Sequence, residues 1–239
     1  MSDALGWLDK TNFWKEFSSR IGDTLKNSLS IDKEGKPKHV PFHQRNNKDK
    51  WTLEIFQKIQ ILSYHLYDLR IIKNSTKLDG IDEFLKRNNV ESYYFLKYTY
   101  ENHQIRIVST LDICSKLGNT VFQLGIKERY CNWLQFSNKL GNAHFSSKVL
   151  LEFAKELDQN RGERNSIVHS GDYVNEILDW YDTYSIDEGY LRDNLLIESF
   201  KKNRDIQSAK LDAKMLKDTE KCYEYSEQFI NSLLIAFKS

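Results

Sequence analysis

The feature that most constrains the fold of this chain is a long apolar stripe between Ser92 and Leu124. Apolar residues recur there at steps of three and four, which is the spacing of one face of an α-helix. The stripe consists of Ile107, Leu111, Cys114, Leu117, Val121 and Leu124. A helix of about 33 residues would be about 50 Å long. Because only other long helices can cover such a stripe, the segment predicts a helical bundle.

The rest of the chain carries few signals that end helices. Only two prolines and ten glycines occur in 239 residues, and no stretch sustains the polar and apolar alternation of a strand. Apolar residues make up 40% of the chain, which is enough to fill a sizeable core. We therefore expect an all-α protein, an up-and-down helical bundle that forms a single helical domain over residues 1–239.

Further helices are predicted from the same spacing of apolar residues. They cover about residues 9–29, 51–72, 81–87, 129–140, 148–157, 174–184, 190–200 and 205–237. Residues 30–50 hold both prolines and six Lys or Arg against three acids, so we predict a basic loop there. This loop is either a solvated connector or a mobile arm that touches phosphate.

Composition limits where the protein acts and what it binds. The formal net charge is +1, so any surface for nucleic acid must be a local patch. The three cysteines are widely spaced and mostly lie in apolar segments, which is typical of core thiols in a reducing cytosol. No stretch approaches the roughly 18 consecutive apolar residues of a membrane span, and the first residues do not resemble a signal peptide. We expect a cytoplasmic protein without a membrane partner.

Residues 161–173, RGERNSIVHSGDY, combine a phosphate-binding side chain with a proton carrier at short spacing. Arg164 and His169 are five residues apart, which on a helix means about 7.5 Å of rise and about 140° of rotation. Asn165 lies four residues before His169, where its amide would share a face with the imidazole and orient the ring. Gly171 favours a helix end just after His169, where the helix dipole would favour an imidazolium.

The segment from Arg164 to His169, Arg-Asn-Ser-Ile-Val-His, resembles the signature of the HEPN family (higher eukaryotes and prokaryotes nucleotide-binding domains), in its ribonuclease and toxin-like bacterial branch. Residues 98–122 resemble the first long helix of one bacterial HEPN subfamily. The resemblance covers about residues 92–185. It implies a bundle of HEPN type with this stretch as its core, and with additional N-terminal helices in residues 1–91 and C-terminal helices in residues 186–239.

The chemistry that Arg164 and His169 support is RNA cleavage without a metal. RNA carries its own nucleophile, the ribose 2′-OH. A histidine, with an ordinary pKa near 6.5, can accept that proton or protonate the 5′-oxygen that leaves. An arginine can hold the nonbridging oxygens as negative charge develops. Because the chain lacks a Gly-rich phosphate loop, a CxxC pair and an HExxH motif, we expect neither a metal nor a cofactor.

The resemblance also implies partners and further site residues. HEPN proteins pair two such motifs across one cleft, so we expect a homodimer that binds RNA. Polar residues of the first bundle helix would face this cleft. Glu101 and Arg106, with Arg161 and Tyr173 beside the motif, are therefore candidates for RNA binding, although they also fit an ordinary solvated surface. HEPN toxins controlled by tyrosine AMPylation have a tyrosine where this chain has Gly171, which argues against an antitoxin of that type.

The biological role implied by the resemblance is that of a toxin or phage-defence effector, with an antitoxin or another defence-system component as its partner. Two other functions stay open. A noncatalytic HEPN-like module that binds RNA or nucleotide would keep its affinity without His169 and lose it without Arg164. A helical scaffold for protein partners would lose stability rather than activity when either residue is replaced.

Overall fold

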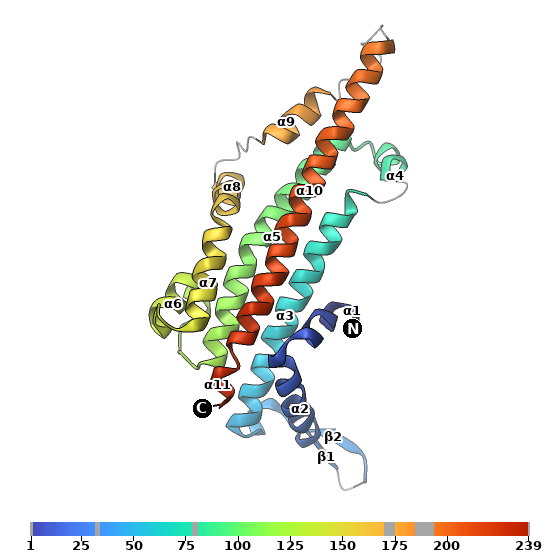
Figure 1. The fold of residues 1–239 in the computed structure, drawn as a ribbon. Helices are drawn as coiled ribbons and strands as arrows, with labels where there is room; N and C mark the ends of the chain where they lie inside the picture. Colours follow the sequence, from blue (N-terminus) through green and yellow to red (C-terminus); the bar gives the residue numbers. More distant parts are fainter. Residues whose placement is uncertain (1, 32–33, 78–80, 170–174, 185–193, 239) are drawn as a thin grey trace. The chain divides into compact units, whose positions relative to one another are not determined.

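The computed structural model describes residues 2–31, 34–77, 81–169, 175–184 and 194–238. Helices dominate these residues, and the strands among them form only a short two-stranded ribbon, so the all-α class is confirmed (Figure 1). Every helix within these ranges is too short or too polar to cross a lipid bilayer.

The elements follow one another along the chain as labelled in Figure 1. The α-helices are α1 (Ser2–Leu5), α2 (Asn12–Asn27), α3 (Asn47–Ser75), α4 (Ile81–Arg87), α5 (Ser92–Val121), α6 (Trp133–Leu140), α7 (Phe145–Glu156), α8 (Asp158–His169), α9 (Glu176–Thr183), α10 (Asn194–Ser232) and α11 (Ile235–Lys238). Short 3-10 helices are η1 (Gly6–Lys10), η2 (Phe42–Gln44) and η3 (Glu128–Tyr130). The long helix predicted to start at Ser92 is confirmed as α5.

The C-terminal part of the chain differs from the prediction. In place of separate helices over 190–200 and 205–237, one helix, α10, runs from Asn194 to Ser232 and is followed by α11. Residues 201–204 contain neither proline nor glycine, so nothing in their backbone ends the helix. Their polar side chains mark a solvated part of α10 rather than a break.

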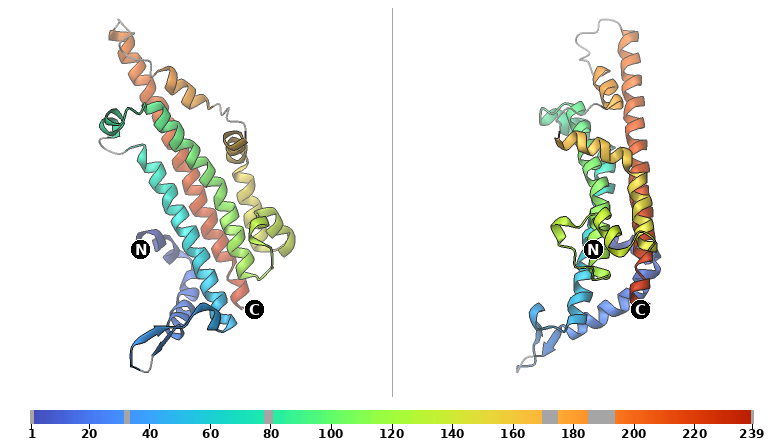
Figure 2. Two further views of the ribbon diagram at one scale, coloured as in Figure 1. Left: turned by 180° about the vertical axis from the view of Figure 1, so that it is seen from behind. Right: turned by 90° about the vertical axis from the view of Figure 1, so that its left-hand side faces the viewer.

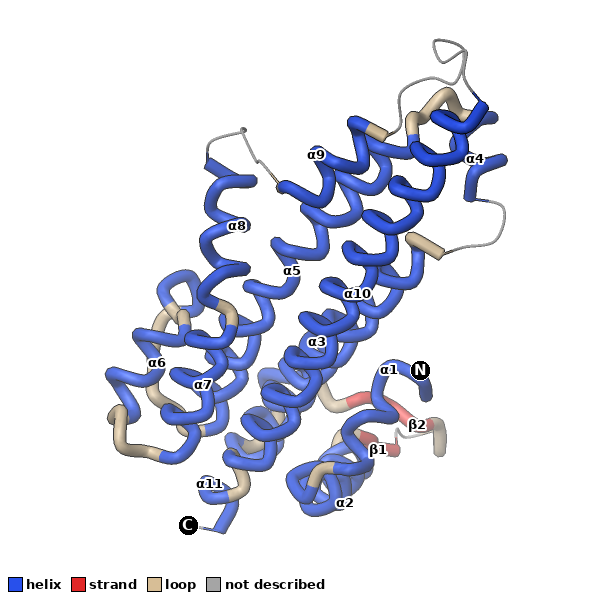
Figure 3. Tube along the Cα trace, turned by 45° about the horizontal axis from the view of Figure 1, so that its top comes forward, coloured by secondary structure: helices blue, strands red, loops and turns tan. Residues whose placement is uncertain are grey.

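The described residues between 30 and 50 form short regular elements in place of one loop. Strands β1 (Leu29–Ile31) and β2 (Pro37–His39) pair antiparallel, with Leu29 opposite His39, and Figure 3 shows this ribbon in red. Helix α3 then begins at Asn47, where the Asn46 side chain accepts from the Asp49 backbone N–H at 2.8 Å. This cap starts the helix four residues earlier than its apolar pattern predicts.

The chain divides into two compact units. Unit 1 comprises Met1–Tyr67, Ser109–Glu156 and Tyr223–Ser239, and unit 2 comprises Asp68–Val108 and Leu157–Cys222. Helices α3, α5 and α10 each contribute residues to both units. The expectation of one domain with its HEPN-like core at residues 92–185 stays a prediction.

Unit 1 is an up-and-down bundle of parts of α3, α5, α7 and α10 (Figure 2). Trp51 of α3 donates to the Thr120 carbonyl of α5 at 2.9 Å. Helix α7 runs antiparallel to α10, because Ser146 donates to the Ser232 carbonyl while Phe153 stacks on Tyr225 with ring centroids 4.9 Å apart. These contacts confirm the predicted up-and-down arrangement within this unit.

Within unit 1, the residues before α3 pack against the C-terminal helices through aromatic rings. Phe13 and Phe17 of α2 contact Phe237 of α11 with ring centroids 5.2 and 5.9 Å apart. The Asn231 side chain accepts from the backbone N–H of Asn12 and Phe13 and so satisfies donors at the start of α2. The N-terminal segment is therefore an integral part of this unit.

Unit 2 combines the first half of α5 with α8, α9, most of α10 and the end of α3. Its apolar core joins α5, α9 and α10 through Leu96, Tyr100, Leu178, Tyr181, Leu211 and Met215. The Asn175 side chain caps α9 by accepting from the backbone N–H of Ile177 and Leu178. All described residues of the predicted site belong to this unit.

Candidate functional site

The predicted motif lies on α8, a helix of 12 residues from Asp158 to His169. An acidic residue in its first turn and His169 in its last both suit the helix dipole. The helix end predicted from Ser170 and Gly171 lies outside the described residues. The His169 side chain is exposed, and Arg164 is half-buried, so the last turns of α8 present both groups to solvent.

Asn165 contacts the arginine of the motif. Its Oδ1 accepts from Arg164 Nη1 at 3.1 Å. Among the described residues, no hydrogen bond joins Asn165 to His169. The amide therefore orients the guanidinium in this structure, and its role in orienting His169 stays a prediction.

The other predicted RNA-binding residues lie on two helices of unit 2. Arg161 of α8 is half-buried, and its Nη1 lies 3.5 Å from Oδ1 of Asp158, one turn earlier on the same helix. Arg106 of α5 donates to Asp68 of α3 at 2.8 Å, and Glu101 of α5 is half-buried. Tyr173 lies outside the described residues. The structure thus links Arg106 to α3, and its contact with RNA stays a prediction.

The inward face of α8 carries polar residues that sequence reasoning missed. Asn160 is 5% exposed, and its Nδ2 donates to Gln104 Oε1 of α5 and to Asp218 Oδ2 of α10, both at 2.8 Å. Burial raises the pKa of the Asp218 carboxyl. One amide therefore joins α8 to two neighbouring helices.

Glu163, the residue before Arg164, makes a second set of bonds to the same two helices. Its Oε2 accepts from the Tyr100 hydroxyl at 2.5 Å, and its Oε1 accepts from Lys214 Nζ at 2.7 Å. The Lys214 ammonium also lies 5.1 Å from the centroid of the Tyr100 ring. The Glu163 side chain is 17% exposed, so this ion pair is largely shielded from water.

His103 is a buried histidine of unit 2 next to this set of polar contacts. Its Nε2 lies 2.9 Å from Thr219 Oγ1. Burial lowers the pKa of its imidazole to about 4, with a smaller contribution from the charge of Lys214. His103 is therefore neutral at pH 7 and serves packing there, unlike the exposed His169.

The sequence held a signal for these contacts. On α8, Asn160, Glu163 and Ile167 follow one another at steps of three and four, so they form the face that a bundle helix turns inward. Two polar residues on that face indicate buried partners on neighbouring helices. On α5, His103 and Gln104 interrupt the apolar stripe in the same way.

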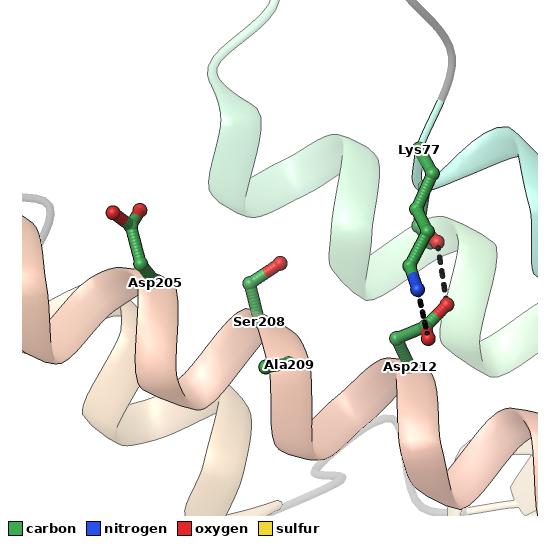
Figure 4. Close-up of a pocket in the computed structure, with 6 residues that line it drawn as sticks. Lys77, Asp205, Ser208, Ala209 and Asp212 are labelled. Atoms are coloured by element: carbon green, nitrogen blue, oxygen red, sulfur yellow. Dashed lines mark hydrogen bonds and ion pairs between the residues drawn. The ribbon is translucent and has the colours of Figure 1, made fainter.

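A pocket of about 280 Å³ also lies in unit 2, between the end of α3 and α10 (Figure 4). Its walls include Asp212, which lies 2.6 Å from Lys77 and 3.6 Å from Lys73. Because Asp212 already pairs with these two lysines, we interpret its ion pairs as a contact that joins α10 to the end of α3. The described part of the chain contains no group of three or more His, Cys, Asp or Glu side chains placed to hold a metal ion.

The chain matches the Cthe2314-like HEPN family over residues 51–238, which include all of α4 to α11 and most of α3. This range contains the motif and its polar contacts to α5 and α10. HEPN domains are of the nucleotide-binding and ribonuclease type. Comparison with curated proteins and with solved structures gives no significant match.

Proposed function

Because this chain belongs to the Cthe2314-like HEPN family, we propose that it is a metal-independent endoribonuclease that cleaves RNA through attack by the ribose 2′-OH. The observation that carries the proposal is the position of Arg164 and His169 on the last turns of α8, within the matched range and accessible to a ligand. RNA is the substrate, since DNA lacks the nucleophile.

In the proposed reaction, the 2′-oxygen attacks phosphorus and the bond from phosphorus to the 5′-oxygen breaks. A histidine takes the proton of the 2′-OH, and an acid gives a proton to the 5′-oxygen. Arg164 binds the nonbridging oxygens while negative charge develops on them. The products are a 2′,3′-cyclic phosphate and a 5′-hydroxyl.

One histidine cannot act as base and acid in the same step, so the proposal includes a homodimer. The second copy would place its own His169 on the opposite side of the scissile phosphate. Val168, next to His169, supports this because its apolar side chain is 47% exposed at the end of α8. Burial of such a side chain against a second copy is favourable.

Such an enzyme would serve as a growth-arresting toxin or a phage-defence effector, held inactive by an antitoxin or another defence component. An alternative is a noncatalytic module that binds RNA or nucleotide. The bond between Arg164 and Asn165 supports this alternative, because it orients the guanidinium for phosphate without involving the histidine. In that case RNA binding depends on Arg164 and is indifferent to His169.

The test is cleavage of labelled total RNA in EDTA by the parent protein, His169→Ala and Arg164→Ala. We expect cyclic phosphate ends from the parent and a loss on the order of 100-fold in both variants. Arg87→Ala is the control, because Arg87 is likewise a helical arginine of unit 2 but lies outside the motif, on α4, where it is exposed and pairs with Glu83. Thermal melting checks that all four proteins fold. Equal cleavage by His169→Ala would refute the proposal.

A further inference from the structure

The motif helix is held to its neighbours by directional bonds rather than by apolar contacts alone. Apolar packing tolerates rotation of a helix about its axis, because the hydrophobic effect has no preferred direction. Hydrogen bonds weaken steeply when their angle changes, so they fix rotation. Asn160 and Glu163 each bond to α5 and to α10, which gives α8 four such restraints on its first half.

These restraints lie next to the reactive groups. Glu163 directly precedes Arg164, and Asn160 lies one helical turn before it. His169 is about 14 Å further along the helix axis than Asn160, and it is exposed. Any rotation or shift at the restrained half is therefore transmitted along α8 to both Arg164 and His169. Misplacement of a reacting group by about 1 Å can cost on the order of 100-fold in rate.

We propose that Asn160 and Glu163 are positioning residues of the ribonuclease reaction, which fix the rotation of α8 against α5 and α10 and thereby place Arg164 and His169. This inference rests on the proposed function. Neither side chain needs to touch RNA, because Asn160 is buried and both carboxylate oxygens of Glu163 already accept hydrogen bonds within unit 2. The role therefore affects the chemical step and leaves RNA affinity nearly intact.

The test exchanges the two partners of one buried bond. Asn160→Asp places a carboxylate against Asp218, so the two groups repel and the bond is lost. Adding Asp218→Asn restores a pair of one amide and one carboxylate. The amide at position 218 now donates to the carboxylate at position 160, which reverses the direction of the parental bond. We expect kcat to fall at least tenfold in the single variant, with KM changed less than threefold. In the double variant kcat should return to within threefold of the parent.

The substrate is a labelled RNA oligonucleotide that contains a cleavage site mapped with the parent protein, and all rates are measured in EDTA. Asp212→Asn is the control for stability. Asp212, like Asp218, is a buried carboxylate of α10, but it pairs with Lys73 near the end of α3 and with Lys77 just after that helix. We expect this variant to keep the parental kcat even if its melting temperature falls as far as that of Asn160→Asp.

The outcomes separate this inference from the proposed function. A folded parent that cuts no RNA overturns the proposed function, and the positioning role with it. An active parent with an unchanged kcat in Asn160→Asp overturns the positioning role alone, as does a double variant that stays as slow as the single one. Glu163→Gln, which removes the charge facing Lys214 and keeps the shape, should lower kcat at unchanged KM. A change in KM alone would place Glu163 in RNA binding instead.

Discussion

The two units of this protein differ in the chemistry of their interiors. Unit 1 is filled by aromatic rings, among them Phe136 and Phe229 with centroids 5.9 Å apart. Its buried polar residues are mainly Ser and Thr, whose hydroxyls bond within one helix, as Ser115 does to the Leu111 carbonyl, or between helices, as Ser146 of α7 does to the Ser232 carbonyl of α10. Unit 2 buries an amide, a carboxylate and an imidazole that bond from one helix to another.

The difference indicates what each unit contributes. Rings that fill a core stabilise the fold through burial and close packing. Buried polar pairs add little net stability, because desolvation offsets much of their attraction. They form only at a narrow range of distances and angles, so they fix the relative orientation of the helices that carry them. In unit 2 this geometry is imposed on α8, the helix with the motif. We therefore expect the aromatic core of unit 1 to contribute mainly to stability, and the polar contacts of unit 2 to fix the orientation of α8.

The largest expected loss of stability comes from a substitution that disrupts the aromatic core of unit 1. Phe229→Ala should lower the free energy of unfolding by about 3–5 kcal/mol, because a fully buried ring leaves a cavity. Phe84→Ala on α4 of unit 2 is the control, since that ring is 57% exposed, and it should cost less than about 1 kcal/mol. Urea unfolding at pH 7.5 measures both. Similar losses in the two variants would show that burial of the Phe229 ring does not stabilise the core of unit 1.

The next effect concerns pH and belongs to unit 2. The pKa of folded His103 is about 4, below the ordinary 6.5, so between these values the unfolded chain binds a proton that the folded chain does not. This histidine's contribution to stability is thus complete above about pH 6.5 and is lost as pH falls towards 4. The loss should reach about 3 kcal/mol.

His103→Gln tests this loss, because glutamine keeps a hydrogen-bonding group near Thr219 and does not titrate. Unfolding is measured at pH 7.5 and pH 4.5 for both proteins. We expect the parent to lose more stability than the variant over this interval. Asp218 acts in the opposite direction, since its raised pKa makes the folded chain take up a proton first, but it is present in both proteins. Equal losses would contradict the assignment to His103.

The smallest expected changes in stability come from replacing one glycine in each unit by alanine. At Gly118 of α5 an added Cβ would lie 2.6 Å from the Phe136 ring and 2.9 Å from the Phe229 ring, so Gly118→Ala should cost about 1–3 kcal/mol through overpacking. At Gly162 of α8 an added Cβ meets nothing within 4 Å. Gly162→Ala should therefore stabilise the protein by up to about 1 kcal/mol. Thermal unfolding shows whether each variant is more or less stable than the parent. A stabilising Gly118→Ala would show that the rings of Phe136 and Phe229 are loosely packed around this position.

The sequence predicts the parts of this fold that depend on local pattern. The stripe from Ile107 to Val121 predicts α5, because the spacing of apolar residues is a local signal. The helix end predicted from Gly171 lies outside the described residues. The continuous α10 was not predicted: the spacing of apolar residues predicts separate helices over 190–200 and 205–237, although no residue from Lys201 to Arg204 ends a helix. Polarity alone does not distinguish a loop from the solvated face of a helix.

The contacts of the candidate site were harder to predict. The motif was visible because Arg164 and His169 lie close together in the sequence. The spacing of Asn160 indicates that it faces inward, but its partner Asp218 is far away along the chain and nothing in the sequence pairs the two. Only the packing of α8 against α5 and α10 brings them within 2.8 Å of each other. Pairing across helices depends on rotation and register, which a single sequence does not report.

The central claim, cleavage by the ribose 2′-OH without a metal, has a direct test. A cleavage site is mapped with the parent protein in EDTA, and two RNA oligonucleotides are compared, one unmodified and one with a single 2′-deoxy nucleotide on the 5′ side of the scissile phosphate. We predict that the unmodified RNA is cut to a 2′,3′-cyclic phosphate and that the 2′-deoxy RNA is bound but not cut. Cleavage of both at similar rates would contradict the mechanism, because the nucleophile would then come from elsewhere.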